Sequence, residues 1–143
     1  MTALLWTTLL ACSSNKQFPT TAIDVAGKSV TVELAVNTKD RAQGLMHRKS
    51  MPTDEGMLFI YPDQKPRSFW MKNTLIPLSI AFIDRDGKIV KIADMEPLVT
   101  QSTKSIYPAK YALEMNKGWF DTHGIAKGAV VTGIPNDAEA KVE

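Results

Sequence analysis

Hydrophobic and polar residues alternate along most of the chain with the period of two that a half-buried β-strand requires. In Lys28–Val36, for example, Val30, Val32 and Leu34 alternate with Thr and Glu. Similar short runs, bounded by Gly, Pro or Asp, occupy 21–25, 57–60, 68–71, 78–83, 88–95, 111–115 and 129–134. We predict a strand for each run.

Two short segments carry helix signals instead. Thr38–Gln43 is preceded by Asn37, and Asn37 or Thr38 can cap its first turn, while Gly44 ends it. Trp119–His123, ended by Gly124, fits one or two turns. Both segments are too short to form a layer of their own.

This order of elements predicts a mainly β fold, a compact antiparallel sandwich or barrel of the jelly-roll kind with one or two short helices. No interval between the strands holds a long helical pattern, so we expect no parallel βαβ unit. The length suits one domain, which we place at 21–135, followed by a disordered tail at 136–143.

The first residues follow a different pattern. Ala3–Ala11 is an apolar run of nine residues, whereas a helix that spans a bilayer needs about 20. The run has the length of a signal-peptide core, and it ends in Leu9-Leu10-Ala11-Cys12. This ending resembles the lipobox of bacterial lipoproteins, which implies cleavage before Cys12 and acylation of its thiol.

We therefore expect 1–11 to be a signal peptide and 12–20 a tether. The domain would be exported and held to the membrane through the lipid anchor alone, on the periplasmic side or at the cell surface. Met1-Thr2 supplies none of the basic residues that precede most signal-peptide cores. The alternative is an N-terminal segment with an inert cysteine.

Composition adds two exclusions. The chain has 17 Lys and Arg against 15 Asp and Glu, a net charge of +2 that does not favour a nucleic-acid partner. Its single cysteine, Cys12, leaves no disulfide to form within the chain.

Several motifs, taken in order, are similar to those of the bacterial and archaeal family called domain of unknown function 192. They are Val32–Ala35, Arg41–Arg48, Glu55–Phe59, Phe69–Thr74, Ile76–Leu78, Phe82–Asp84, Asp86–Val90, Tyr111–Glu114 and Gly124-Ile125. The resemblance covers about 30–131 and implies a compact jelly-roll-like fold, often behind an export signal. It implies no activity. This chain has Ser79 where the family usually has Asp.

The first candidate site is Trp70-Met71-Lys72-Asn73. On a strand, Trp70 and Lys72 would share one face, so Trp70 could be a platform for a flat ligand, with Lys72 and Asn73 as polar contacts. The alternative places Trp70 in the core and Asn73 in a turn.

The second candidate set is Arg48, Glu33 and Glu114. Arg48 could bind an anionic ligand, or it could fix a loop by pairing with a buried acid, for which Glu33 and Glu114 are candidates. The two glutamates could instead act as the acid and base of a glycoside hydrolase.

No metal or cofactor site is expected. His47 and His123 are the only histidines, and the methionines lack the close grouping of a copper site. We therefore expect a binding or structural module of the cell envelope. An enzyme is the less favoured interpretation. The partner of this module would be an envelope glycan, a small molecule or an envelope protein. The alternatives are an envelope-polymer hydrolase that uses Glu33 and Glu114, and a protein-docking module.

Overall fold

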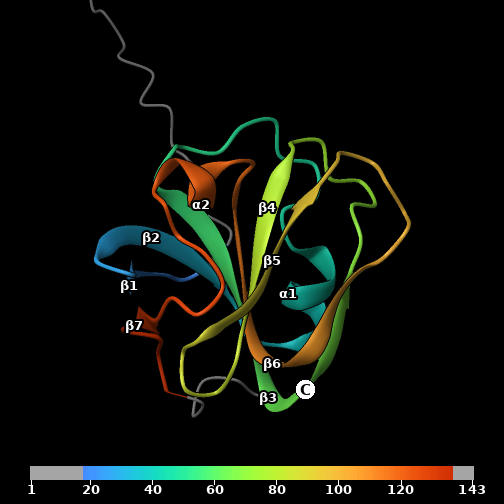
Figure 1. Cartoon of the computed structure of the whole chain (residues 1–143). Helices are drawn as coiled ribbons and strands as arrows, with labels where there is room; N and C mark the ends of the chain where they lie inside the picture. The colour runs from blue at the N-terminus through green and yellow to red at the C-terminus, as the bar shows by residue number, and fades with distance from the viewer. Residues whose placement is uncertain (1–17, 137–143) are drawn as a thin grey trace, which may run out of the picture.

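The computed structural model describes residues 18–136 of the 143-residue chain. Cys12, the expected signal peptide and nearly all of the expected tail lie outside these residues. The strands are β1 (Thr20–Val25), β2 (Lys28–Ala35), β3 (Glu55–Phe69), β4 (Leu78–Ile83), β5 (Ile89–Met95), β6 (Thr103–Asn116) and β7 (Val131–Thr132). Two helices, α1 (Thr38–Gln43) and α2 (Trp119–Thr122), complete the fold, which is mainly β as predicted (Figure 1).

All seven strands form one curled sheet in the order β5-β4-β6-β3-β2-β1-β7. Every pairing is antiparallel except that of β2 with β3, which is parallel. The expectation that no parallel pair would occur is therefore wrong. Residues 36–54, with α1 and the loop after it, return the chain to the start of β3, so this crossover contains only one short helix.

β3 and β6 are longer than the sequence pattern predicts, because they run together as a curled ribbon with α1 inside its curve (Figure 1). The pattern finds only the apolar parts of β3. Between these parts the pairing with β6 shifts register between Ile60 and Lys65, so the polar residues there do not alternate regularly.

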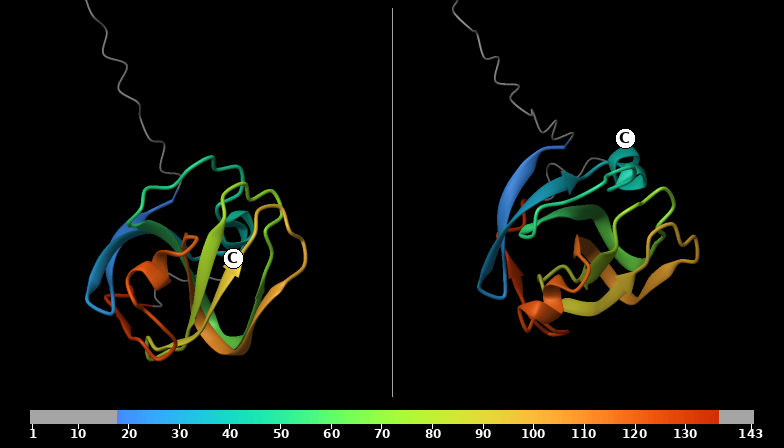
Figure 2. Two further views of the ribbon diagram at one scale, coloured as in Figure 1. Left: turned by 45° about the horizontal axis from the view of Figure 1, so that its top comes forward. Right: turned by 90° about the horizontal axis from the view of Figure 1, so that it is seen from above.

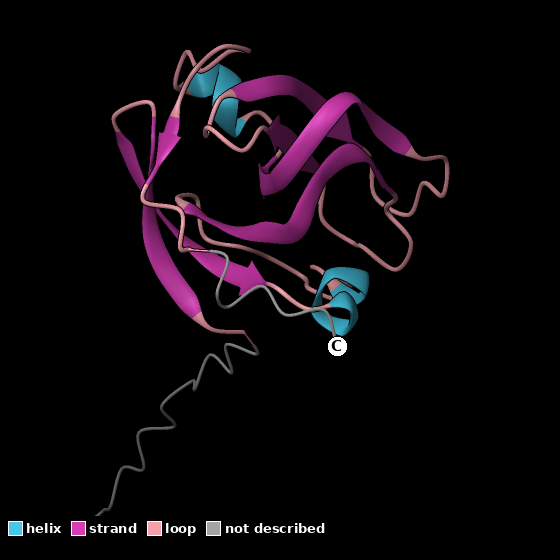
Figure 3. Cartoon of the chain, turned by 90° about the horizontal axis from the view of Figure 1, so that it is seen from below, coloured by secondary structure: helices cyan, strands magenta, loops and turns pink. Residues whose placement is uncertain are grey.

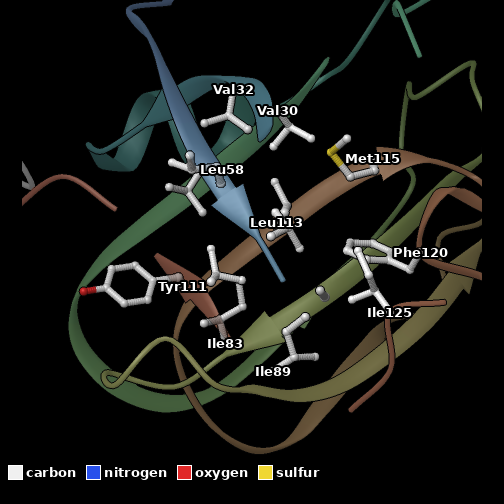
Figure 4. Packing of buried hydrophobic residues seen from close by; sticks show 14 of the residues in the cluster. Val30, Val32, Leu58, Ile83, Ile89, Tyr111, Leu113, Met115, Phe120 and Ile125 are labelled. Atoms are coloured by element: carbon white, nitrogen blue, oxygen red, sulfur yellow. The ribbon is translucent and has the colours of Figure 1, made fainter. Parts of the chain in front are cut away.

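Each face of the sheet carries its own hydrophobic cluster. Leu58 and Leu113 point to the cluster on the side of α2, where Phe120 also lies (Figure 4). Phe59 and Ala112 are the neighbours of these two residues along the strands, and they point to the cluster on the side of α1. Strands therefore separate the two helices (Figure 3).

The capping predictions for α1 are confirmed. The Asn37 side chain accepts a hydrogen bond from the Asp40 amide at 2.8 Å, and Gly44 follows the helix with a φ of 49°. Within residues 18–136, no helix has the length and apolar character needed to cross a membrane.

Candidate functional site

A cleft of about 490 Å³ opens between α1 and the curled ribbon. Its walls come from α1 with residues 43–46, from Phe59, 61–63 and 67–69 of β3, and from Trp70 and Thr74 beyond β3. Glu114 of β6 completes the lining. The volume falls in the range of about 300–1,000 Å³ that is usual for small-molecule sites.

Glu114 is the most unusual residue of the cleft. Strand register places it between Met57 of β3 and Ile80 of β4, so the apolar face of the sheet surrounds it. Its exposed fraction is 4%, and its carboxyl group has no hydrogen bond or ion pair with any residue in 18–136.

Burial without a partner penalises the charged form of a carboxyl group. Desolvation accordingly raises the pKa of Glu114 from 4.5 to about 8. At pH 7 the side chain is mostly neutral, so it can donate a hydrogen bond as well as accept one. Glu114 therefore offers the cleft a proton rather than a negative charge.

Tyr61 lies beside this carboxyl group and between two arginines. Its ring centroid is 4.9 Å from the guanidinium carbon of Arg41 and 3.8 Å from that of Arg67. Burial raises the pKa of Tyr61, and the charge of Glu114 acts in the same direction. The hydroxyl group of Tyr61 bonds to no other residue that the structure describes.

Arg41 carries the free positive charge of the cleft. It donates to the carbonyls of Val36 and Ile60, at 2.5 and 3.0 Å, and to the Thr38 hydroxyl at 3.3 Å. A guanidinium has five N–H groups, so two remain. No carboxylate of the described residues lies within 4.0 Å of Arg41, and desolvation lowers its pKa.

Arg67 is held more firmly. It pairs with the Asp63 carboxylate at 2.6 Å and donates to the Ala109 carbonyl at 3.0 Å. Lys65 also pairs with Asp63 at 2.6 Å. Hydrogen bonds from Lys65 and Arg67 lower the pKa of Asp63 to about 2. These contacts fix the bulged part of β3 that forms one wall.

Aromatic rings form a further part of the cleft wall. Phe59 and Phe69 pack edge to face with centroids 5.0 Å apart. Trp70 follows at the rim with 49% of its surface exposed, which excludes the alternative that it is a core residue. Lys72 lies on the same side, with its ammonium 5.2 Å from the Trp70 centroid.

Two other candidates, Arg48 and Glu33, lie outside the cleft lining. Arg48 forms two hydrogen bonds to Glu33, each 2.6 Å long, which match the loop-fixing alternative. The side chain of Glu33 is 8% exposed and that of Arg48 is 25% exposed. Hydrogen bonding to Glu33 raises the pKa of Arg48.

The two glutamates do not share a site. Glu33 pairs with Met57 across β2–β3, and Met57 pairs with Glu114 across β3–β6. Met57 is fully buried and stands between them. With strands about 4.8 Å apart, the two backbone positions are about 10 Å apart.

Asn73 and Lys72 border the cleft without lining it. Asn73 adopts a φ of 54°, and its carbonyl accepts a hydrogen bond from the His47 amide at 2.8 Å. Asn73 thus joins two loops, as the turn alternative expects. Of the six candidates, the structure brings only Trp70 and Glu114 into the cleft.

The sequence pattern of the family described as DUF192, an uncharacterized ACR, matches residues 21–133. The chain belongs to the DUF192 family.

Two solved structures are similar to this chain in sequence and fold. A protein from Sinorhizobium meliloti 1021, described as a candidate transcription regulator, is 36% identical with a TM-score of 0.77. The match covers 80% of this chain and 94% of that one. A protein of unknown function from Novosphingobium aromaticivorans is 31% identical with a TM-score of 0.76, covering 80% and 86%. Among curated proteins, none matches the chain.

Ser79 contributes to the fold and lies outside the cleft. It is buried, donates to Asp94 at 2.5 Å and accepts a hydrogen bond from the Gly118 amide at 2.9 Å. Gly118 precedes α2 and has no capping side chain of its own. Ser79 therefore supports the start of α2.

Sequence reasoning missed Arg41, Tyr61 and Arg67. Arg41 lies within a motif shared with the DUF192 family, and this was the one available signal. Tyr61 and Arg67 lie in the irregular part of β3 that the pattern left unassigned. Within residues 18–136, no group of three His, Cys, Asp or Glu side chains could hold a metal ion.

Proposed function

We propose that this domain is a ligand-binding module of the cell envelope and that the cleft beside α1 is its binding site. The observation that carries the proposal is Glu114, whose carboxyl group has no partner among residues 18–136 and which lines a cleft of ligand size. Folded proteins pair nearly all buried polar groups, so an unpaired one in a cleft supports a ligand as its partner.

The lining sets the chemistry of the ligand. Neutral Glu114 and the hydroxyl of Tyr61 favour a hydrogen-bonding group at the inner end, and the two unused N–H groups of Arg41 favour an oxygen acceptor. Trp70 favours a flat apolar face at the rim. A sugar unit of an envelope glycan, or a small molecule with similar groups, meets these demands.

The envelope location is a separate part of the proposal. It is supported by the lipobox-like residues ending in Cys12 and by the polar stretch after them. Growth with an alkyne fatty acid tests it: the wild-type chain is expected to take up the label, and Cys12→Ser is expected to lose it. Label that persists in Cys12→Ser would contradict the anchor.

A hydrolase is the second candidate, although not with Glu33 and Glu114. The cleft lining contains Glu114, whose pKa is raised to about 8, and Asp63, whose pKa is lowered to about 2. Carboxyl groups with divergent pKa values are typical of acid–base pairs. Against this, Asp63 is already engaged by Lys65 and Arg67.

Nuclear magnetic resonance with isotope-labelled protein tests the binding site. Peptidoglycan fragments and envelope oligosaccharides are titrated into the wild type, Trp70→Ala and Tyr107→Ala. The two aromatic residues are matched, since they are 49% and 48% exposed and only Trp70 lines the cleft.

The proposal expects shift changes around the cleft and at least tenfold weaker binding in Trp70→Ala, with Tyr107→Ala unchanged. Equal loss in both variants, or no binding by any envelope component, would sink it. Turnover of a bound glycan that disappears in Glu114→Gln would favour the hydrolase instead.

A further inference from the structure

Four large apolar side chains are exposed together beside the cleft. Trp70, Leu75, Leu98 and Val99 are 49%, 45%, 59% and 44% exposed. They belong to two segments, 70–75 and 98–99, which we call the apolar loop pair.

Backbone hydrogen bonds hold the two loops together. The Met71 amide donates to Val99 at 2.8 Å, and the Leu98 amide donates to Thr74 at 3.1 Å. The loops after β3 and after β5 lie side by side in both orientations of Figure 2. The two segments that carry these exposed side chains are therefore held side by side.

Leu98 adopts a φ of 65°, a left-handed conformation that costs an ordinary residue about 1–3 kcal/mol. Its side chain recovers little of this cost by packing, because more than half of it is exposed. The fold therefore holds an apolar side chain in solvent at a position where the backbone is strained.

Two exposed lysines lie beside the loop pair, and two acids, Asp94 and Glu96, lie near Val99. The ammonium of Lys72 lies over the Trp70 ring. Lys49 lies in the loop after α1, which is bonded to Asn73 through the His47 amide. Both lysines are exposed, and neither has an acid partner among the described residues. The acid of segment 96–99 is Glu96, which Lys117 neutralises. Trp and Leu beside unpaired Lys form the composition that binds lipid interfaces.

The described chain also begins at this end of the domain. Phe18 is buried, with its ring 5.9 Å from the guanidinium of Arg48. Arg48 follows His47, whose amide bonds to Asn73 of the loop pair. Cys12 lies six residues before Phe18. Six residues reach about 20 Å at most, so a lipid on Cys12 would keep this end of the domain close to the bilayer.

We propose that the apolar loop pair rests on an anionic bilayer surface, so that the domain touches the membrane directly and not only through an anchor. The inference depends on the proposed envelope location and is independent of any ligand in the cleft. Trp70 belongs both to the loop pair and to the rim, so the cleft opens at the membrane surface.

Site-specific labelling tests this contact. Because Cys12 is the single cysteine, full-length Cys12→Ser provides a background for Val99→Cys or Val130→Cys with a polarity-sensitive dye. The two valines are 44% and 48% exposed. Val130 is a control, since its carbonyl bonds to Ala26 at the β1–β2 turn, away from the loop pair. Leu98→Cys repeats the test if Val99→Cys fails to fold.

The probe is a vesicle of phosphatidylethanolamine and phosphatidylglycerol, with phosphatidylcholine as the neutral comparison. We expect a blue shift at position 99 that is several-fold larger than at 130, and that weakens in phosphatidylcholine and in high salt. No shift at 99, equal shifts at both positions, or equal shifts with both lipids would overturn the proposal. If Cys12 still takes up fatty acid, such a failure rejects the loop contact and leaves the envelope location standing.

Discussion

Glu33 and Glu114 are two buried acids on the same face of one sheet, separated by the side chain of Met57. Their exposed fractions are nearly equal, at 6% and 4%. Glu33 receives two short hydrogen bonds from Arg48, whereas Glu114 receives none from the described residues. Equal burial therefore does not give these two acids the same role. The presence or absence of an arginine partner separates them.

The Glu33 region uses its charge to position a loop. Arg48 comes from the segment between α1 and β3, and its fork matches both carboxylate oxygens of Glu33. This pair helps to hold the chain along the crossover that makes β2 and β3 parallel. The two opposite charges balance each other within the domain.

The Glu114 region leaves a polar group unsatisfied at a cost in stability. A buried carboxyl group without a partner destabilises the fold whenever solution pH favours ionisation. Such a cost is typical of functional sites, where binding requires groups that the fold leaves free. The two acids thus separate a structural region from a candidate functional one.

The largest expected effect comes from breaking the Glu33 pair. Glu33→Gln leaves Arg48 without its counter-charge, and removing one member of a buried pair costs about 3–5 kcal/mol. Because a quarter of the Arg48 side chain is exposed, we expect the lower end of this range. The free energy of unfolding, measured by urea denaturation, should fall by about 3 kcal/mol.

The double variant Glu33→Met with Arg48→Met is the control. Since it removes both charges, it should recover much of the loss. A Glu33→Gln variant as stable as the wild type would show that the pair does not fix the loop.

Glu114→Gln should change stability in the opposite direction. The unfolded carboxyl group loses its proton near its ordinary pKa of 4.5, whereas the folded one keeps it up to about 8. Between these values the unfolded state is charged and the folded state is not, so stability falls as pH rises, by about 1.4 kcal/mol per pH unit.

Glutamine does not ionise, so the variant loses this dependence of stability on pH. We therefore expect a variant more stable than the wild type by about 3 kcal/mol at pH 7, with little difference at pH 4. Denaturation at both pH values measures it. A wild type whose stability does not fall across this window would mean that Glu114 ionises freely and has a partner after all.

The sequence was sufficient for the features that depend on neighbouring residues. The alternation in Lys28–Val36 and the Asn37 cap are local, and both are found in the structure. The parallel β2–β3 pair could not be predicted, because it depends on where the loop after α1 returns.

Only part of the site could be predicted, because the rest depends on contacts between residues that are distant in the sequence. Glu33 and Glu114 have the same strand context, and only the position of Arg48, fixed by the crossover, separates their roles. Tyr61 and Arg67 reach the cleft through a register shift in β3, which breaks the alternation that would have marked them.

The smallest expected effect on stability is that of Tyr61→Phe, and it tests the difference between the two regions most directly. Tyr61→Phe removes a hydroxyl group that bonds to no described residue, so the free energy of unfolding should change by less than about 0.5 kcal/mol. Thr74→Val is a matched control at the same cleft, because its buried hydroxyl donates to the Lys72 carbonyl at 3.2 Å. Losing that bond should cost about 1 kcal/mol.

Binding of whichever glycan fragment the titrations identify should show the reverse order. Tyr61→Phe should weaken binding about tenfold, equivalent to about 1.4 kcal/mol, because its free hydroxyl is available to the ligand. Thr74→Val should change binding less, because its hydroxyl is already used by the fold. If Tyr61→Phe destabilises the domain as much as Thr74→Val and leaves binding intact, the polar groups of the cleft belong to the fold. Glu114 would then resemble Glu33 in role, and the difference between the two regions would disappear.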